Sequence, residues 1–208
     1  MSQSLVRIPL NTAPEQAERL LALQRGFAEL CNALAPLVRS TRVWNRVALH
    51  HLAYRQLREQ FPAMGSQMVC NAIYSVSRTC RLVFQHPGSP FHLDKLSGRA
   101  LPLLRFTENC PVYFDRHTLS LKQGVLSMFT LDGRMRFQLS LEPEVLQRFQ
   151  TQKLREVVLS RVADAAFELA FLLGEAPAAE AGLAESESAL PSLEAGEIPE
   201  YVMVEEAA

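Results

Sequence analysis

Apolar residues recur at steps of three and four through three segments in the first half of the chain. This spacing puts the apolar side chains on one face of a helix, so it predicts three amphipathic helices. We expect them over residues 14–38, 43–61 and 67–84. Pro62 ends the second helix, and the segment HPGSPF (residues 86–91) ends the third, because proline lacks the N–H group that a helix interior needs.

Apolar and polar residues alternate in shorter runs at the N-terminus and again after residue 100, which is the pattern of strands. Strands are expected over residues 5–10 and over Val112–Phe114, Thr118–Leu121, Val125–Thr130 and Met135–Leu141. The turn pairs Gln123-Gly124 and Asp132-Gly133 join successive strands, so an antiparallel meander is predicted. Pro143 then begins a short helix over residues 144–152.

Residues 154–173 fit two structures. Their Ala, Leu and Glu content favours a helix, whereas the runs VVLSRV and FELAFLL on either side of Ala163–Ala166 fit a β-hairpin. Composition alone favours the helix, and the pattern leaves both open.

The sequence after Gly174 is rich in Ala, Glu, Ser and Pro and has no aromatic residue before Tyr201. Such a segment buries too little apolar surface to offset the entropy lost on ordering. We therefore predict a disordered acidic tail over residues 176–208. Within it, Tyr201–Val204 fits either a short docking motif or a chance apolar cluster.

Charge is distributed unevenly along the 208 residues, a length that suits one compact domain or two small ones. All 21 Lys and Arg residues lie in residues 1–161 with 11 of the 22 acids, and the other 11 acids follow. Eighteen of the bases are Arg. Because guanidinium groups bind phosphates in a bidentate manner and stack on bases, this body predicts a nucleic-acid partner. An Arg-rich genome would give the same bias.

No catalytic or metal-binding constellation is visible, so neither a cofactor nor a metal is expected. The cysteines lack CxxC spacing and are predicted to be buried thiols, while Asp115 and Asp132 fit Asx turns. The five histidines are scattered. No stretch reaches the ~20 apolar residues of a membrane span and no leader segment is present, so a cytoplasmic protein is expected.

Four phrases follow one another in a particular order. They are FAELCNALAPLV, ALHHLAYRQLREQF, MGSQMVCNAIYSVSRTCRLVF and CPVYFDRHTLSLKQGVLSMFTLDGRMRFQLSL. In this order, over roughly residues 5–175, they resemble the N-terminal half of TnpB, the transposon-encoded RNA-guided nuclease ancestral to compact type V CRISPR effectors. In that family such phrases form a wedge-like β-barrel interrupted by a helical recognition lobe.

The resemblance therefore implies an α+β fold in which an antiparallel β-barrel is interrupted by a three-helix insertion. Its parts are a first strand over residues 1–13, a helical lobe over 14–98, the remaining strands with a short helix over 99–175, and the tail over 176–208. The run LREVVLSRVADAAFELAFLLGEAP is similar to the family's strand pair before its nuclease domain, so the resemblance favours the hairpin.

The resemblance also implies binding residues. Wedge domains of the family hold the guide-RNA scaffold, which implies RNA contact by Arg116, Lys122, Arg134 and Arg136 and, from the motif YRQLR, by Arg55 and Arg58. Because the start of the third helix approaches DNA in the family, Ser66, Gln67 and Asn71 are implied in DNA contact. Arg78 and Arg81 join them, because steps of three and four place both on one helix side with Asn71 and Ser75. Plain solvated surfaces and strand ends protected from aggregation fit these bases too.

The sequence lacks the three acids and the zinc module of the family's RuvC-like nuclease domain. It therefore predicts a non-catalytic protein that binds a structured, guide-like RNA and double-stranded DNA beside a target, alone or as one subunit of a split effector with a separately encoded RuvC-like nuclease. An alternative class is an adaptor or structural protein whose basic face binds acidic proteins or its own tail. A truncated transposon remnant fits as well.

Overall fold

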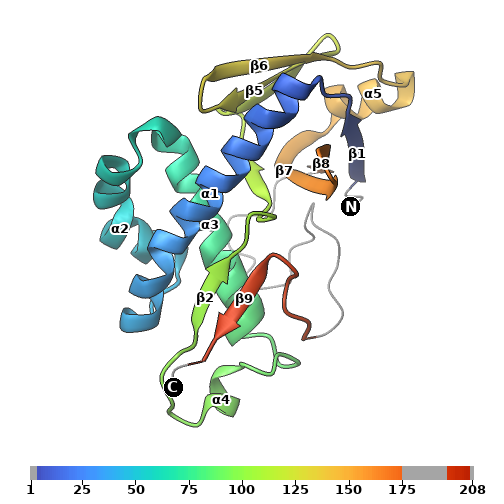
Figure 1. Ribbon diagram of the computed structural model, residues 1–208. Coiled ribbons are helices and arrows are strands. Elements are labelled where there is room, and N and C mark those ends of the chain that lie inside the picture. Colours follow the sequence, from blue (N-terminus) through green and yellow to red (C-terminus); the bar gives the residue numbers. More distant parts are fainter. Residues whose placement is uncertain (1–3, 175–195, 207–208) are drawn as a thin grey trace. The chain divides into compact units, whose positions relative to one another are not determined.

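The computed structural model of the protein describes residues 4–174 and 196–206 (Figure 1). In these residues the chain has a mixed α+β fold with antiparallel sheets. The helices are α1 (Pro14–Thr41), α2 (Arg46–Gln60), the 3-10 turn η1 (Pro62–Met64), α3 (Gly65–Phe84), α4 (Leu93–Leu96) and α5 (Pro143–Thr151). The strands are β1 (Ser4–Leu10), β2 (Leu103–Phe106), β3 (Val112–Phe114), β4 (Leu119–Lys122), β5 (Val125–Thr130), β6 (Gly133–Gln138), β7 (Lys153–Ala163), β8 (Ala166–Gly174) and β9 (Val202–Glu205).

The described residues form two compact units. The first contains those of Met1–Leu21 and Pro111–Ser192, and the second contains those of Ala22–Cys110 and Leu193–Ala208. The chain passes from the first unit to the second within α1, returns before β3, and contributes β9 to the second unit. No helix of the described part combines the length and apolar character needed to cross a membrane.

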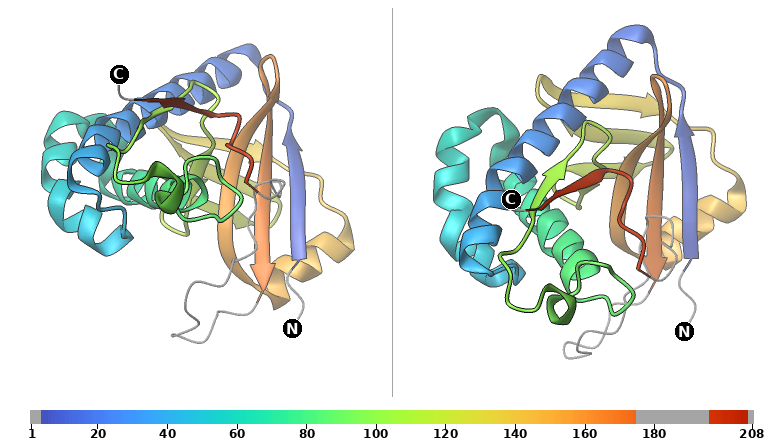
Figure 2. Two further views of the ribbon diagram at one scale, coloured as in Figure 1. Left: turned by 90° about the horizontal axis from the view of Figure 1, so that it is seen from below. Right: turned by 60° about the horizontal axis from the view of Figure 1, so that its bottom comes forward.

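The first unit is built on a four-stranded antiparallel sheet in the order β1-β8-β7-β3. The ambiguous residues 154–173 belong to its long β7–β8 hairpin, and β1 pairs with β8 along its whole length (Figure 2). Every residue from Leu169 to Gly174 is buried, and Phe149 of α5 packs edge-on against Phe171 with 5.1 Å between ring centres. Burial of these large apolar side chains from both faces outweighs the helix propensity of the segment.

A three-stranded meander, β4-β5-β6, belongs to the same unit. Gln123 and Gly124 have φ values of 50° and 77°, which is the left-handed pair of a type I′ turn between β4 and β5. Gly133 at the next turn has φ 99°. The meander strands predicted from the alternating pattern are confirmed, with ends that differ by at most three residues.

The second unit contains most of α1 together with α2, η1, α3 and α4. α2 packs against α3, and the rings of Trp44 and Phe84 lie 5.5 Å apart. α2 begins at Arg46, later than predicted, because the Asn45 carboxamide oxygen accepts the N–H groups of residues 47 and 48 and caps the helix. The three predicted helices are confirmed.

The C-terminal part of the described chain is a strand of the second unit. β9 pairs antiparallel with β2, and the N–H group of Thr107 extends the ladder by donating to the Tyr201 carbonyl at 3.0 Å (Figure 2). Burial raises the pKa of the Tyr201 phenol, which lies beside the hydroxyl of Thr79 on α3. For residues 196–206 the prediction of a disordered tail is therefore wrong, because pairing with β2 supplies the buried contacts that the local sequence lacks. The other residues of the predicted tail lie outside the described ranges.

The predicted barrel is not confirmed. The strands of the described residues form three separate sheets of four, three and two strands, and none of these sheets closes on itself. The mixed composition of helices and antiparallel strands agrees with the predicted α+β class.

Candidate nucleic-acid interface

The outer face of the meander carries most of the bases that the sequence assigns to RNA. Burial alternates along β6, so that Met135 and Phe137 are buried while Arg134 and Arg136 are exposed. The register of β4 places the exposed Lys122 on the same face. We define the meander face as Lys122, Val125, Ser127, Phe129, Arg134 and Arg136.

Strand register arranges the meander face in rows. Phe129 lies opposite Arg134, and in the next row Ser127 lies opposite Arg136. Lys122 lies one row further along, on the other side of the central strand. Because neighbouring strands are about 4.8 Å apart and rows on one face about 7 Å apart, the three bases surround the centre of the sheet over roughly 10–14 Å. An extended single strand of a few nucleotides matches this span.

Arg134 is held in place by three hydrogen bonds. Its guanidinium donates to the hydroxyl and the carbonyl of Ser127 at 2.9 and 2.8 Å, and to the carbonyl of His117 at 3.3 Å. A guanidinium fixed in this way loses little side-chain entropy when an anion binds beside it.

Arg116 lies at the turn between β3 and β4. The Asp115 carboxylate accepts the N–H groups of His117 and Thr118, both at 3.0 Å, which is the predicted Asx turn. The exposed Arg116 therefore stands beside the same His117 that receives a hydrogen bond from Arg134. The structure brings all four predicted bases of this unit to one sheet and its turn.

The meander has few acidic residues to neutralise its positive charge. Four bases but only one acid, Asp132, lie between Arg116 and Gln138. The Asp132 carboxylate is in the β5–β6 turn and lies 3.9 Å from the guanidinium of Arg19 on α1. The strands β4, β5 and β6 themselves contain no acidic residue, so the meander face suits a polyanion.

The two predicted RNA contacts on α2 differ from each other. The side chain of Arg55 is 94% exposed and pairs with Glu59 at 3.3 Å. Arg58 is half-buried, and one nitrogen of its guanidinium is buried with no acceptor among the described residues. Both belong to the second unit, whereas the meander face belongs to the first.

The predicted DNA contacts are spread along α3. Ser66 and Arg81 are exposed, but they are 15 positions apart, which corresponds to about 22 Å of helix. Gln67 and Arg78 are half-buried, and Asn71 is only 6% exposed. These five side chains do not form one cluster.

The expectation that α3 has an outward polar side through Asn71 and Ser75 is wrong. Ser75 is 1% exposed, and so is the next polar residue on that side, Thr79. The reason is that α3 is covered on this side as well, with Tyr201 of the C-terminal segment lying beside Thr79. A spacing of four residues placed these polar groups on one side correctly but could not show what packs there.

Phe129 and Ser127 were not identified from the sequence as members of the interface. Their signal is the alternation in VLSMFT, which places residues 125, 127 and 129 on one side of β5. An aromatic residue in a strand is more often part of the core, and only the burial pattern shows that Phe129 is half-buried on the outer side.

The meander face offers guanidinium and ammonium groups for phosphates and one aromatic ring for a base, which are the components of a single-strand binding surface. Within residues 4–174 and 196–206, no three His, Cys, Asp or Glu side chains are grouped to hold a metal ion. No protein-family model matches the sequence, and no curated protein matches it.

Proposed function

We propose that this protein is a non-catalytic RNA-binding protein whose meander face contacts RNA. The observation that carries the proposal is the placement of Lys122, Arg134 and Arg136 on one face with Phe129, on strands that contain no acidic residue. The bases neutralise phosphates and release counterions, while the ring provides a surface on which a base stacks.

The proposal agrees with the resemblance to the recognition half of TnpB, in which a wedge-like domain holds a structured guide RNA. On the same ground we propose that the exposed start of α3 at Ser66 contacts double-stranded DNA and that a separately encoded RuvC-like nuclease completes the effector. Isolation of the complex from its native host tests both parts, through sequencing of the bound nucleic acid and identification of a RuvC-like subunit. A complex with neither guide-like RNA nor a nuclease subunit rejects the relationship to TnpB.

The test of the meander face is a comparison of two double variants. Lys122→Gln with Arg136→Gln removes one Lys and one Arg from the meander face. Arg148→Gln with Lys153→Gln removes the same charges from other exposed positions of the same unit. Affinity for an RNA hairpin with a single-stranded flank is measured at several salt concentrations.

The first double variant is expected to bind about tenfold more weakly at low salt. Its slope of log affinity against log salt falls by about 1.4, because each lost phosphate contact on a single strand contributes about 0.7. The control variant keeps the slope. Equal losses in both variants exclude the meander face as the site, and an absence of salt-sensitive RNA binding by the unchanged protein rejects the function.

A second candidate function, binding of acidic protein segments, is favoured by one contact. The guanidinium of Arg105 on β2 donates to the carboxylate of Glu205 on β9 at 2.5 and 3.3 Å, so a basic side chain of this protein already holds an acidic strand. Competition distinguishes the two candidates. An RNA binder releases its RNA to unlabelled RNA far more readily than to polyglutamate of the same total charge, whereas an adaptor for acidic proteins responds equally to both.

A further inference from the structure

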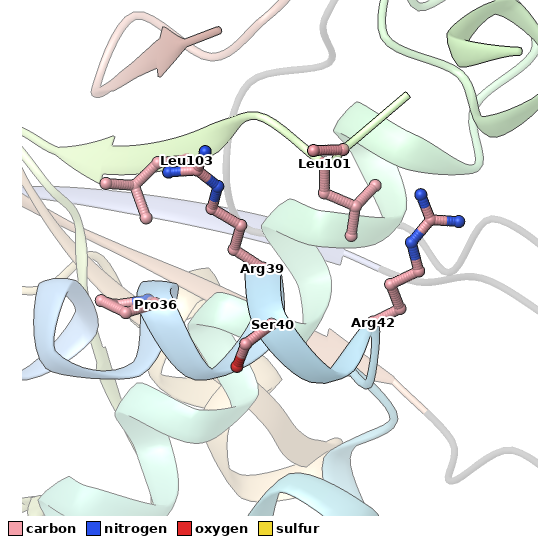
Figure 3. A pocket seen from close by; sticks show the side chains of 7 residues that line it. Pro36, Arg39, Ser40, Arg42, Leu101 and Leu103 are labelled. Atoms are coloured by element: carbon pink, nitrogen blue, oxygen red, sulfur yellow. The ribbon is translucent and has the colours of Figure 1, made fainter. Parts of the chain in front are cut away.

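A pocket of about 380 Å³ lies in the second unit, outside every site assigned so far. It is formed between the last two turns of α1 and the segment that leads into β2 (Figure 3). Its volume falls within the range of small-molecule sites. The side chains that matter are Pro36 and Arg39 of α1, Arg42 directly after this helix, and Leu101 and Leu103 of the opposite segment.

One part of the pocket is apolar. The side chains of Leu101 and Leu103 point from their segment toward α1, and Pro36 lies on the helix below them (Figure 3). Leu101 is 1% exposed, so the accessible apolar surface comes from the exposed Pro36 and the half-buried Leu103. An apolar surface suits an aromatic ring better than a hydrated ion.

Arg39 supplies a cation beside this surface. Its side chain extends from α1 toward Leu103 (Figure 3), it is half-buried, and its guanidinium has no hydrogen-bond acceptor among the described residues. Its charge reaches the carboxylate of Glu205, whose pKa is lowered by the hydrogen bond from Arg105 and further by the charge of Arg39. The charge of Arg39 therefore already stabilises one carboxylate, and its N–H donors are available for another anion.

Arg42 stands at the other end of the pocket in an unusual backbone conformation. Its φ is +55°, in the left-handed region where a helix commonly ends with glycine. Its guanidinium donates to the carbonyl of Arg99 at 2.7 Å, which ties the end of α1 to the loop before β2. Glycine adopts this conformation with less strain than arginine does. The presence of arginine here therefore indicates that its guanidinium has a role.

We infer that this pocket binds a nucleotide, with the phosphate at Arg39, the base against Pro36 and Leu103, and the acceptor atoms of the base toward Arg42. Inorganic phosphate leaves the apolar part empty, and a nucleoside leaves the guanidinium of Arg39 without an anion. A nucleotide uses both parts. The inference deepens the proposed function, because RNA is one source of such a nucleotide and a free mononucleotide is the other.

Basic residues near a helix C-terminus also stabilise the helix through its dipole, and the bond to Arg99 has a structural role. If the two arginines had only these structural roles, their substitution would change nucleotide binding only as far as it changed the stability of the protein. Arg42→Gly separates them, since glycine relieves the left-handed conformation while removing the guanidinium.

The experiment measures binding of adenosine monophosphate, adenosine and inorganic phosphate to the full chain by calorimetry. Adenosine monophosphate is expected to bind at least tenfold more tightly than either of its parts. Arg39→Gln weakens this binding about tenfold, and Arg42→Gly weakens it similarly without lowering the melting temperature. Arg25→Gln, which removes an exposed base of the same unit that pairs with Glu108 at 3.5 Å, leaves binding unchanged.

Equal binding of phosphate and adenosine monophosphate overturns the inference, as does equal binding by the Arg39→Gln variant and the unchanged protein. To distinguish the two sources, the chain is irradiated with free 4-thiouridine monophosphate or with RNA that contains 4-thiouridine, and the crosslinked peptides are identified. Crosslinks to residues 100–103 by the RNA identify an RNA nucleotide as the occupant, and crosslinks by the free compound alone identify a mononucleotide. No crosslink there from either probe overturns the inference.

The outcomes also separate this pocket from the meander face. If the Lys122 and Arg136 variant loses RNA binding but keeps mononucleotide binding, the pocket is a nucleotide site that is independent of the meander face. If the protein binds RNA in a salt-sensitive manner but does not bind adenosine monophosphate, the nucleotide site in the pocket is rejected and the proposed function is kept.

Discussion

The carboxamide of Asn32 forms two hydrogen bonds with the backbone of Phe106. Its nitrogen donates to the Phe106 carbonyl at 2.9 Å, and its oxygen accepts the Phe106 N–H group at 2.7 Å. β2 has β9 as its partner strand, and Asn32 from α1 satisfies its backbone groups at Phe106 in the way that a second neighbouring strand would. A single helical side chain therefore joins α1 to β2.

Asn32→Ala is expected to lower the free energy of unfolding by about 2–4 kcal/mol, because it leaves a donor and an acceptor of the buried Phe106 backbone unsatisfied. Urea denaturation measures this loss. Asn11→Ala, at an exposed position before α1, serves as the control and is expected to change stability by less than about 0.5 kcal/mol. A loss at Asn32 no larger than at Asn11 contradicts the role assigned to the carboxamide.

Gly196→Ala is expected to disrupt docking of the C-terminal segment. Gly196 has φ +93°, and a Cβ atom there would lie 2.1 Å from the carbonyl oxygen of Gly88. Gly98 has φ +80° and open space around it, so Gly98→Ala carries only the backbone cost of about 1 kcal/mol and is the matched control.

Hydrogen exchange of the Val202–Glu205 amides measures the docking directly. We expect Gly196→Ala to speed their exchange at least tenfold and Gly98→Ala to leave it nearly unchanged. Similar exchange in both variants contradicts the close packing of Gly196 on Gly88.

Local signals were sufficient for the elements of this fold but not for its long-range pairing. The alternation in VLSMFT and the Gln123-Gly124 turn predicted the meander, because strand, turn and strand lie within one short stretch of sequence. Residues 154–173 needed the resemblance to be identified as a hairpin, since their composition favours a helix.

Partners distant in sequence could not be predicted from either end alone. The sequence around Tyr201 does not predict that it lies beside β2 and Thr79, because both are about 100 residues earlier in the chain. The same distance explains why the side of α3 with Asn71 and Ser75 was expected to be exposed. Of the candidate site, the bases were predicted individually, and their arrangement on one face with Phe129 follows only from the strand register.

The ion pair between Arg105 and Glu205 predicts an acid-sensitive C-terminal strand. The hydrogen bond from Arg105 lowers the pKa of the Glu205 carboxyl relative to the unfolded chain. Its contribution is therefore complete above the ordinary carboxyl pKa of about 4.3 and is lost as the pH falls through the lower folded value.

The backbone NMR signals of β9 report this effect. Between about pH 5 and pH 3 they are expected to move toward the undocked state in the unchanged protein, by a modest amount because the pair is exposed to solvent. Glu205→Gln removes this response, whereas Glu200→Gln, which removes an exposed carboxylate from the same segment, retains it. A response that survives in Glu205→Gln assigns the acid sensitivity to another group.

The cysteines of the second unit are expected to differ sharply in reactivity. Cys31 and Cys80 are completely buried, and burial raises the pKa of both thiols, so very little thiolate exists there at neutral pH. Cys70 on α3 is only half-buried. Iodoacetamide at slightly alkaline pH should therefore modify Cys70 first, at least a hundredfold faster than Cys31 or Cys80, as followed by peptide mass spectrometry. In denaturant all the cysteines should react at similar rates, and native labelling of Cys31 as fast as that of Cys70 shows that the core of α1 and α3 opens readily.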